Sequence, residues 1–475
     1  MLQEFKVQRR ISKGMELLIK PKEIESKEQF MEQFNENIPE DSIDKNICVF
    51  GQGFVGLPLA LSFAFRGCNT IGVDVEESLV HEINCGKTHH TEKFYEVTIE
   101  EVLQMQLEDK RYKITIDADM AVRQCNNIIV TVGIPIKNGD YIMDHLESVC
   151  KTIGRNLKKD DLVIIRSTVI PGTTEEFCMP ILEKESGMKA GEDFYLAYAS
   201  ERIAEGKAFD EFANMPTLVG AVNKKSLERA IDVLSIVCKA DVISASCIKV
   251  VETSKVFENI QRDVNIAMSQ EFARFTETFG IDIFEVISLA NTHKRVNLLT
   301  PGPGVGGYCI PNAYHYIAPK AEKMCVDMPL LKLAREKNAV LPEFIANKVE
   351  ELLSKQGKNI RGCKIAVLGL AMKDYSNDDR ISPPIDICRI LINRGADVAA
   401  FDPVVPTYYD FKVESQDESL KDADSVIVLT KQHEIDFTDC EHIAKIMKER
   451  PICIDTKNVI HEIQAKKYGI ELWKI

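Results

Sequence analysis

Short runs of β-branched residues alternate with amphipathic segments of helical length, and this alternation restricts the fold more than any other feature. The first runs are Ile47–Phe50, Thr70–Val73, Ile128–Thr131, Leu162–Ile165 and Tyr195–Tyr198. Strands separated by helices are typical of a parallel sheet that is covered on both faces. We therefore predict an α/β fold whose first half is a doubly wound parallel sheet.

The same alternation returns after a helical stretch. Strand signals are absent between about Asp241 and Asn338, where a long helix is expected from Lys249 to Phe279, with Gly280 as its C-cap. Four further strands are expected at Lys364–Leu368, Asp397–Phe401, Ser425–Leu429 and Ile452–Asp455. The chain is thus predicted to hold two Rossmann-like domains joined by a central helical domain, with a weak resemblance between the two α/β halves.

Residues 1–45 differ in composition from the rest of the chain. Basic residues dominate up to Lys22, and acidic residues dominate after it. Ser26 and Gln29 resemble a capping box, and Phe30 and Phe34 are spaced for one face of a short helix. We interpret this segment as a solvated or docking arm; a specific partner site is the alternative.

Length and charge narrow the class of protein. The 475 residues predict about three domains at roughly 150 residues each. The chain has 59 basic and 73 acidic residues, which gives a net charge of -14. We therefore expect no nucleic-acid-binding surface that extends over the whole chain. The longest apolar run, Leu57–Phe65, is too short to span a bilayer, and charges near the N-terminus leave no secretory signal.

The cysteines point to a reducing compartment. The chain has 14 of them, with no CxxC pair and no histidine-rich cluster beside them. Such cysteines are expected to be buried thiols, so neither a disulfide framework nor a metal site is predicted. Together these features predict a cytoplasmic protein without a membrane span.

A glycine-rich turn indicates a dinucleotide site. Gly51, Gly53 and Gly56 follow a predicted strand and open a predicted helix, and Asp74 ends the next strand. The glycines would permit a tight turn, backbone approach to a pyrophosphate and close helix packing, while Asp74 would accept ribose hydroxyls and repel a 2′-phosphate. NAD is therefore favoured over NADP; a sheet turn without cofactor is the alternative.

Two further segments follow predicted strands, where ligands of such sheets collect. Hydroxyls in Arg166–Thr174 could orient water or phosphate, or form an ordinary polar turn. Glu201 could act as a general base, with a surface ion pair to Arg202 as the alternative.

The helical middle carries the remaining candidates. Lys255 and Asn259 are four residues apart on the long helix, where they could stabilise an oxyanion or form a solvated face. Cys309 ends a loop rich in glycine and proline, Pro301–Cys309, which clears space around its sulfur. A nucleophilic thiol and a buried small apolar residue are the two interpretations of Cys309.

Taken in order, these motifs resemble the UDP-glucose/GDP-mannose dehydrogenase family, in particular its branch acting on UDP-N-acetylhexosamines such as UDP-GlcNAc and UDP-ManNAc. The resemblance covers about Asn46 to Ile475. It rests on GQGFVG with Asp74, TVGIP (Thr131–Pro135), STVIPGTT (Ser167–Thr174), SERIAEG (Ser200–Gly206), Lys255 with Asn259, NTHKRVN (Asn291–Asn297), PGPGVGGYCIP (Pro301–Pro311), GLAMKDYSNDDRISPP (Gly369–Pro384), FDP (Phe401–Pro403) and DTKNV (Asp455–Val459).

The resemblance implies an NAD-dependent oxidation of a sugar C6 hydroxyl to a carboxylate by two hydride transfers, which would supply uronic-acid precursors for a surface polysaccharide. It makes Cys309 the nucleophile that passes through a thioester. Lys255 and Asn259 would stabilise oxyanions, and Glu201 with Thr168 would serve hydrolysis and proton transfer.

The resemblance also implies the binding residues and the domains. NAD would contact Gly51, Gly53, Phe54, Val55, Gly56, Asp74, Thr131 and Thr168. The UDP-sugar would contact Arg202, Ile203, Lys255, Asn259, Arg295, Gly306, Lys373 and Arg380, with Arg295 reaching the phosphates from a neighbouring subunit. The expected domains are NAD-binding (46–240), central helical and dimerising (241–340) and UDP-sugar-binding (360–475), in a homodimer or higher homo-oligomer.

The sequence departs from the family pattern at Ala313. The family usually carries an aspartate four residues after the cysteine, where it helps to order the catalytic groups. Its loss leaves two alternatives: a modified member that oxidises or rearranges a UDP-sugar without releasing the acid, and a catalytically silent nucleotide-sugar-binding protein. Ser200 and Tyr308 also differ from the usual proline and histidine, and both are expected to be tolerated.

Overall fold

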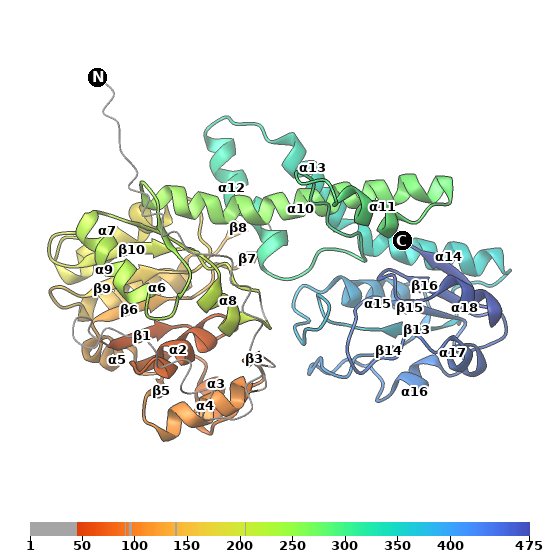
Figure 1. Ribbon diagram of the computed structural model, residues 1–475, viewed down its shortest axis with the longest axis horizontal. Helices are drawn as coiled ribbons and strands as arrows, with labels where there is room; N and C mark the ends of the chain where they lie inside the picture. The colour runs from red at the N-terminus through yellow and green to blue at the C-terminus, as the bar shows by residue number, and fades with distance from the viewer. Residues whose placement is uncertain (1–44, 91, 95–96, 138–139, 205) are drawn as a thin grey trace, which may run out of the picture. The chain divides into compact units, whose positions relative to one another are not determined.

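The computed structural model describes residues 45–90, 92–94, 97–137, 140–204 and 206–475 (Figure 1). The charged arm, with its expected helix near Ser26, lies outside the described residues. Within the described ranges, no helix is both long and apolar enough to cross a membrane.

The first sheet has eight main strands. They are β1 Asn46–Phe50, β2 Asn69–Val73, β5 Tyr112–Thr115, β6 Asn127–Val130, β9 Leu162–Ile165, β10 Tyr195–Ala199, β11 Thr217–Ala221 and β12 Val242–Ser244, in the order β12-β11-β10-β9-β6-β1-β2-β5. All neighbours are parallel except β10 and β11. Because β1 lies between β2 and β6, the loop after β1 opens where the strand order reverses, the usual ligand position in such sheets.

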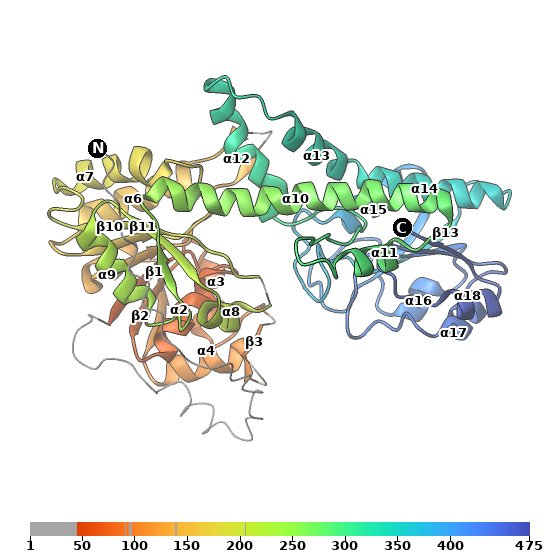
Figure 2. The same cartoon turned by 45° about the horizontal axis from the view of Figure 1, so that its top comes forward.

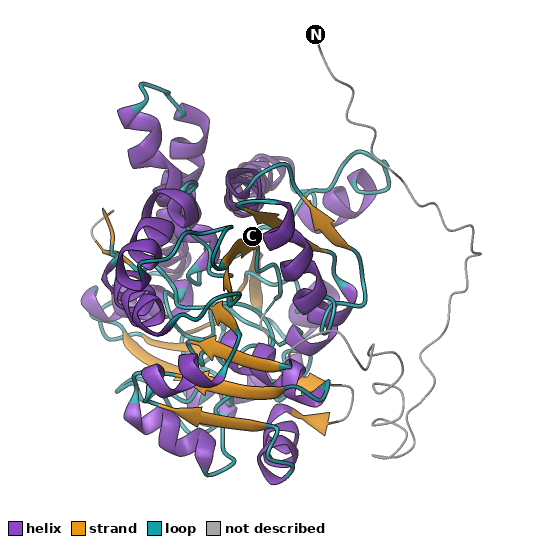
Figure 3. Cartoon of the chain, turned by 90° about the vertical axis from the view of Figure 1, so that its left-hand side faces the viewer, coloured by secondary structure: helices purple, strands orange, loops and turns teal. Residues whose placement is uncertain are grey.

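Helices cover both faces of this sheet (Figure 3). They are α2 Gly56–Phe65, α3 Glu77–Asn84, α4 Ile99–Glu108, α5 Ala118–Gln124, α6 Asp144–Asn156, the π-helical turn η1 Thr174–Cys178, α7 Met179–Ser186, α8 Ala208–Asn214 and α9 Lys224–Leu234. Two short hairpins, β3 Lys93–Phe94 with β4 Val97–Thr98 and β7 Ile136–Lys137 with β8 Asp140–Tyr141, interrupt the alternation. Burial on both faces explains why the central strands are continuous apolar runs.

The middle of the chain is built around a helix of 32 residues, α10 Ile248–Phe279. This helix ends at Gly280, whose φ is 63°. It is followed by α11 Ile283–Ala290, α12 Cys309–Lys323, α13 Pro329–Ala339 and α14 Leu341–Lys355. Helices α12 and α13 both pack against α10 (Figure 2).

The second sheet has five parallel strands. They are β13 Lys364–Leu368, β14 Asp397–Phe401, β15 Ser425–Val428, β16 Ile452–Asp455 and β17 Glu471–Lys474, in the order β14-β13-β15-β16-β17. Its helices are α15 Pro383–Asn393, α16 Gln416–Leu420, α17 Cys440–Ile446 and α18 Glu462–Lys467.

The predicted fold class is confirmed: two Rossmann-like sheets flank a helical region. Every strand expected from the sequence is present, and the long helix ends at Gly280 as expected. The expected absence of strands after Asp241 is wrong at β12, a three-residue strand on the sheet edge. The sequence prediction also missed β5, β11 and β17, and the antiparallel pairing of β11 could not be inferred from apolar runs.

Both sheets use the same turn after their first strand, which supports the resemblance between the two halves. Gly51 has φ 83° and donates its N–H to the end of β2 at 2.8 Å; Gly369 has φ 91° and donates to the end of β14 at 2.9 Å. An aspartate then accepts an amide of each turn: Asp74 from the residue after Gly51 and Asp402 from the residue after Gly369, both at 2.7 Å. The positive φ is a reason for glycine at both positions.

A buried ion pair fixes α13 to α10. Asp263 on α10 accepts hydrogen bonds from Arg335 at 3.0 Å and from Asn338 at 2.7 Å. All three side chains are buried, and burial raises the pKa of Asp263 while Arg335 opposes that rise. Removing one partner of such a pair leaves the other charge buried without compensation.

Asp263→Ala is expected to lower the free energy of unfolding by about 3–5 kcal/mol, because Arg335 loses its buried partner. Thermal and urea unfolding measure the effect. Glu336→Ala, which removes an exposed ion pair with Lys332 on the same helix α13, is the matched control and should change stability by less than about 1 kcal/mol. Equal effects of the two substitutions would contradict this role of Asp263.

Candidate functional site

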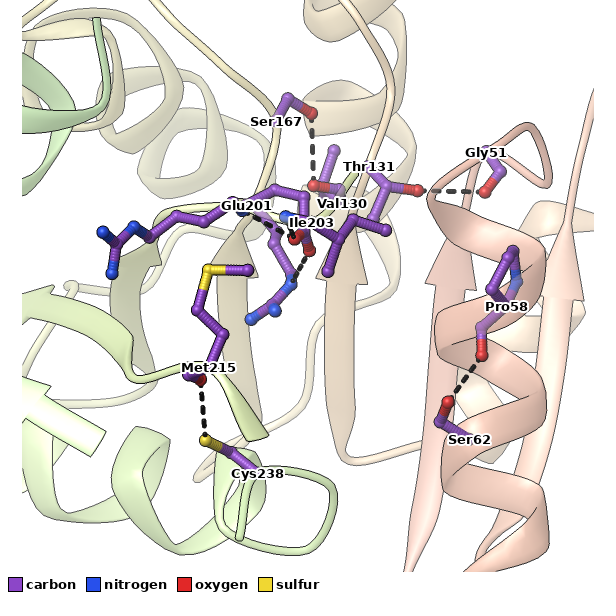
Figure 4. A network of polar contacts seen from close by, with 12 residues as sticks. Gly51, Pro58, Ser62, Val130, Thr131, Ser167, Glu201, Ile203, Met215 and Cys238 are labelled. Carbon is purple, nitrogen blue, oxygen red and sulfur yellow. Dashed lines mark hydrogen bonds and ion pairs between the residues drawn. The ribbon is translucent and has the colours of Figure 1, made fainter. Parts of the chain in front are cut away.

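The loop between β1 and α2 forms a narrow backbone cradle. A β-carbon at Gly56 would overlap the carbonyl oxygen of Gly51 and lie 2.7 Å from Oγ1 of Thr131. Thr131 donates that hydroxyl to the Gly51 carbonyl at 2.9 Å, which ties the end of β6 to the turn (Figure 4). Glycine is therefore required at position 56 by close packing.

The entrance to α2 suits an anion. A β-carbon at Gly53 would meet open space, and Phe54 and Val55 are half-buried beside it. In this fully described helix, the first turn has no acidic residue and no side chain caps the N-terminal amides. Unpaired N–H groups and the helix dipole attract phosphate. The half-buried Asp74 stands at the end of β2, so these residues fit a dinucleotide.

The polar loop after β9 is anchored by a carboxylate that the sequence analysis did not single out. Glu252 on α10 is fully buried and accepts the amide hydrogens of Gly172 at 2.5 Å and Thr174 at 2.9 Å. Burial raises the pKa of Glu252, and these amides oppose the rise. This anchor fixes the loop that carries the half-buried Thr168. The sequence feature that could have indicated Glu252 is its spacing, one helical turn before Lys255 on α10.

Glu201 is buried after β10 and its carboxylate is engaged on both oxygens. One oxygen accepts Nε of Arg166 at 2.7 Å; the other accepts the amides of Arg202 at 2.7 Å and Ile203 at 2.9 Å (Figure 4). The alternative of a surface pair between Glu201 and Arg202 is wrong, because Arg202 pairs with Glu258 at 3.1 Å. Arg166, which lies 35 positions earlier in the chain, is the partner that sequence spacing did not reveal.

Lys255 and Asn259 lie on the buried side of α10. Their exposed fractions are 8% and 3%, so the alternative of a solvated helix face is wrong. Within the described part of the chain, Nδ2 of Asn259 has no hydrogen-bond partner. Both residues are among those that line a groove of about 970 Å³ along α10, most of whose lining belongs to the exposed face of the helix around Phe257; neither Cys309 nor Glu201 lines it. An unpaired amide and an ammonium at one groove can receive a negatively charged oxygen.

Cys309 is the first residue of α12 and is exposed. The alternative of a buried apolar residue is therefore wrong for this cysteine. Of the 14 cysteines, all in the described ranges, ten are buried and four are exposed: Cys85, Cys247, Cys309 and Cys325.

Close packing explains the glycines before Cys309. A β-carbon at Gly306 would lie 2.6 Å from the carbonyl oxygen of Ile381 and 2.9 Å from the Met372 side chain. Gly307 has φ 79° and donates its amide to Ile381 at 3.1 Å. The loop that presents Cys309 therefore lies directly on the 372–383 segment of the second α/β unit.

The environment of Ala313 is apolar. Ala313 is fully buried in the cluster that contains Tyr316 of α12 and Val256 of α10. The preceding residue, Asn312, is buried, and its Nδ2 has no partner among the described residues.

The substrate residues expected in the second half of the chain differ in their surroundings. Arg380 pairs with Asp378 at 2.6 Å and lies over the rings of Phe54 and Tyr308, at 4.2 and 5.2 Å from their centroids. It therefore connects the cofactor loop with the loop before Cys309. Lys373 is half-buried, whereas Arg295 is exposed in the loop after α11.

Glu92 is a buried carboxylate between the two α/β units. One oxygen accepts the Gly206 amide at 3.0 Å, and the other has no partner in the described residues. Burial raises its pKa to about 7, and the nearby charge of Lys373 opposes this rise.

Three models of one protein family match the chain along its length. They describe the UDP-glucose/GDP-mannose dehydrogenase family: its NAD binding domain at residues 45–238, its central domain at 249–340 and its UDP binding domain at 366–462. The domain limits expected from the sequence stay a prediction beside these matches.

Curated relatives and solved structures agree with the family match. UDP-N-acetyl-D-mannosamine dehydrogenase of Pyrococcus horikoshii is 34% identical over 416 residues, 88% of this chain and 96% of the relative. Protein CapL of Staphylococcus aureus is 32% identical over 91% of this chain and all of the relative. The structure of the P. horikoshii enzyme gives a TM-score of 0.83 at 32% identity, covering 90% of this chain and 98% of that one.

Glu92→Gln is expected to flatten the pH dependence of stability. The folded-state pKa of about 7 lies above the ordinary value of 4.5, so the folded protein holds a proton that the unfolded chain releases. The contribution of Glu92 to the free energy of unfolding is largest below about pH 4.5 and is lost as the pH rises through about 7. Glutamine keeps the acceptor for Gly206 without titrating.

The measurement is the melting temperature from pH 4.5 to 8. The melting temperature of the parent protein should fall across this window relative to that of the variant. Parallel curves for the two proteins would show that Glu92 does not titrate in this range.

Proposed function

Because the chain belongs to the UDP-glucose/GDP-mannose dehydrogenase family, a family of NAD-dependent dehydrogenases, we propose that it oxidises the C6 hydroxyl of a UDP-N-acetylhexosamine to a carboxylate. Among such sugars we propose UDP-N-acetyl-D-mannosamine, because the relatives from P. horikoshii and Campylobacter jejuni are named for it. A uronate of this kind suits polysaccharide assembly.

The exposed Cys309 at the N-terminus of α12 is the observation that carries the proposal. After the first hydride leaves C6, the Cys309 sulfur adds to the aldehyde carbon and forms a thiohemiacetal. Loss of the second hydride gives a thioester, and water cleaves it to the carboxylate and the free thiol. One CH₂OH group and one water thus yield a carboxylate, two hydrides and three protons, and the difficult oxidation is divided into two hydride steps.

Residues of the first sheet hold the cofactor in this proposal. NAD, when bound, accepts the hydride in each step. The N–H groups of Gly53, Phe54 and Val55 would hold its pyrophosphate and Asp74 would hold its ribose hydroxyls, with Thr131 and Thr168 at the adjacent strand ends. Gly51 and Gly56 keep the turn narrow enough for this approach.

Lys255 and Asn259 stabilise the negative oxygen of the thiohemiacetal and of the hydrolytic intermediate. The unpaired Nδ2 of Asn259 and the largely buried Lys255 support this role. Donors that are already in position stabilise a developing charge without reorganisation.

Glu201 and Thr168 serve hydrolysis and proton transfer. Oε1 of Glu201 already accepts the two amides of Arg202 and Ile203, whereas Oε2 accepts only Nε of Arg166 and keeps one lone pair that can accept a water molecule. Thr168 is held near the site by the Glu252 anchor and orients that water.

The nucleotide sugar lies between the 372–383 segment and α10 in this proposal. Lys373 and Gly306 contact it from one side, and Arg202 and Ile203 contact it beside Glu201. Arg380 and the exposed Arg295 meet the phosphates, with Arg295 reaching them from a neighbouring subunit.

Alanine at position 313 motivates one alternative, a modified enzyme that does not release the acid. A carboxylate at this buried position would need a charged partner, whereas alanine packs there without one. The hydrolytic half-reaction then depends on Glu201 and Thr168. The number of hydrides transferred per sugar separates the two functions.

Cys309→Ser is expected to reduce uronate formation by more than about 1,000-fold, because the covalent step loses its nucleophile. Mass spectrometry measures the uronate and, after acid quenching, the sugar-nucleotide adduct on the protein. Cys247→Ser is the matched control: it changes an exposed cysteine at the N-cap of α10, where serine is favoured. Undiminished uronate from Cys309→Ser would overturn the thioester route.

An apolar stripe on α10 supports a homodimer. Phe257, Met268, Phe272, Phe275 and Phe279 are exposed at spacings that place them along one side of the helix, and Phe275 is 63% exposed. Exposed aromatic residues gathered in this way mark an interface. We propose that two copies of the chain pair through this stripe.

Phe275→Asp is expected to weaken the dimer by about 100-fold or more, because a two-fold interface loses two buried aromatic rings. Sedimentation at micromolar concentration measures the change. Tyr408→Asp, at another exposed aromatic residue, should leave the dimer intact. A monomeric parent protein would contradict the proposed interface.

A further inference from the structure

His90 is buried, and both of its ring nitrogens lack a partner among the described residues. Its exposed fraction is 5%, and neither Nδ1 nor Nε2 has a hydrogen-bond partner in the part of the chain that the structure describes. A neutral imidazole always carries one N–H group and one acceptor nitrogen. Burying both without partners is unfavourable, so an unexplained polar group of this kind points to a missing partner.

The ring lies in a cluster beside the cofactor loop. His90 contacts the ring of Phe54 edge to face at 4.8 Å between centroids and stacks on His89 at 4.5 Å. The guanidinium of Arg380 lies on the same Phe54 ring at 4.2 Å. Asn377 donates a hydrogen bond to the carbonyl oxygen of His89 at 2.9 Å, which fixes this segment to the second α/β unit.

The position of Phe54 indicates which bound ligand would lie beside the cluster. Phe54 lies between Gly53, where a side chain would meet open space, and the uncapped N-terminus of α2. An anion at this helix end would therefore have Phe54 backbone on one side and the cluster beside it. Burial, followed by the charges of His89 and Arg380, lowers the pKa of His90 to about 3, so the ring is neutral and offers an N–H group.

We propose that His90 is a further nucleotide-binding residue of this chain, which donates its ring N–H to a diphosphate oxygen of the nucleotide bound at α2. A phosphate oxygen supplies the acceptor that the described residues lack, and the interaction is a charge-assisted hydrogen bond. For the ligand to reach the nitrogens, a side chain of the cluster must turn aside. Arg380, which is exposed, can do so by leaving its pair with Asp378.

The ligand chemistry is a diphosphate, and two nucleotides of this family carry one. The place of Phe54 in the cofactor loop favours NAD over the UDP-sugar. The inference rests on nucleotide binding by the family and not on the proposed thioester reaction, so it is tested by binding alone. Cys309→Ser should bind NAD as the parent protein does, which keeps the two tests separate.

The test is calorimetric titration of His90→Phe with NAD and, separately, with UDP. Phenylalanine fills the same space and removes two unpaired polar atoms, so the melting temperature of the ligand-free protein should stay level or rise. NAD affinity should fall about tenfold or more. His89→Phe, at the exposed neighbour, is the matched control and should change affinity less than about twofold.

His90→Gln restores an N–H donor and should recover part of the NAD affinity. A loss confined to UDP would overturn the assignment of His90 to the nucleotide bound at α2. Unchanged affinity for both ligands in His90→Phe would overturn the proposal.

A second measurement does not depend on the folding of a variant. In the parent protein labelled with ¹⁵N-histidine, NAD should shift one imidazole resonance, which is absent in His90→Gln. No histidine resonance shifting with NAD or UDP would overturn the proposal as well.

Discussion

The buried polar face of α10 determines how the site is assembled. Glu252, Lys255, Asn259 and Asp263 follow one another at intervals of three or four residues, and each is buried. Buried polar groups need partners. Glu252 at one end takes backbone amides of the loop after β9, and Asp263 at the other end takes Arg335 and Asn338 of α13. The two middle residues, Lys255 and Asn259, are among those that line a groove, where a ligand can supply their missing partners.

The two α/β units share the same turn after their first strands. Each has a glycine turn after its first strand and an aspartate at the end of the next, so both present backbone amides at the same edge of a parallel sheet. The loop before Cys309 joins them, because its glycines pack on the 372–383 segment while α12 packs on α10. Arg380 and the His90 cluster add a second connection at the cofactor loop.

Much of the fold followed from local chemistry. The central strands are apolar runs because both sheet faces are covered, and Gly51, Gly56 and Gly280 mark conformations that glycine suits. The partners of the buried charges could not be predicted, because they come from distant positions: Arg166 pairs with Glu201 and Glu252 holds Gly172. Spacing placed Lys255 and Asn259 on one face but could not say that this face is buried. For His90, no motif in the sequence gave a signal.

The central claim is a four-electron oxidation by a chain that has alanine at position 313. The most direct measurement is the number of NADH molecules formed per UDP-N-acetyl-D-mannosamine consumed, with the product identified by mass spectrometry. Two NADH and the uronate are expected if Cys309, Lys255, Asn259 and Glu201 act as proposed. One NADH or none, with no uronate, would contradict this claim and assign the chain to the modified enzymes that do not release the acid.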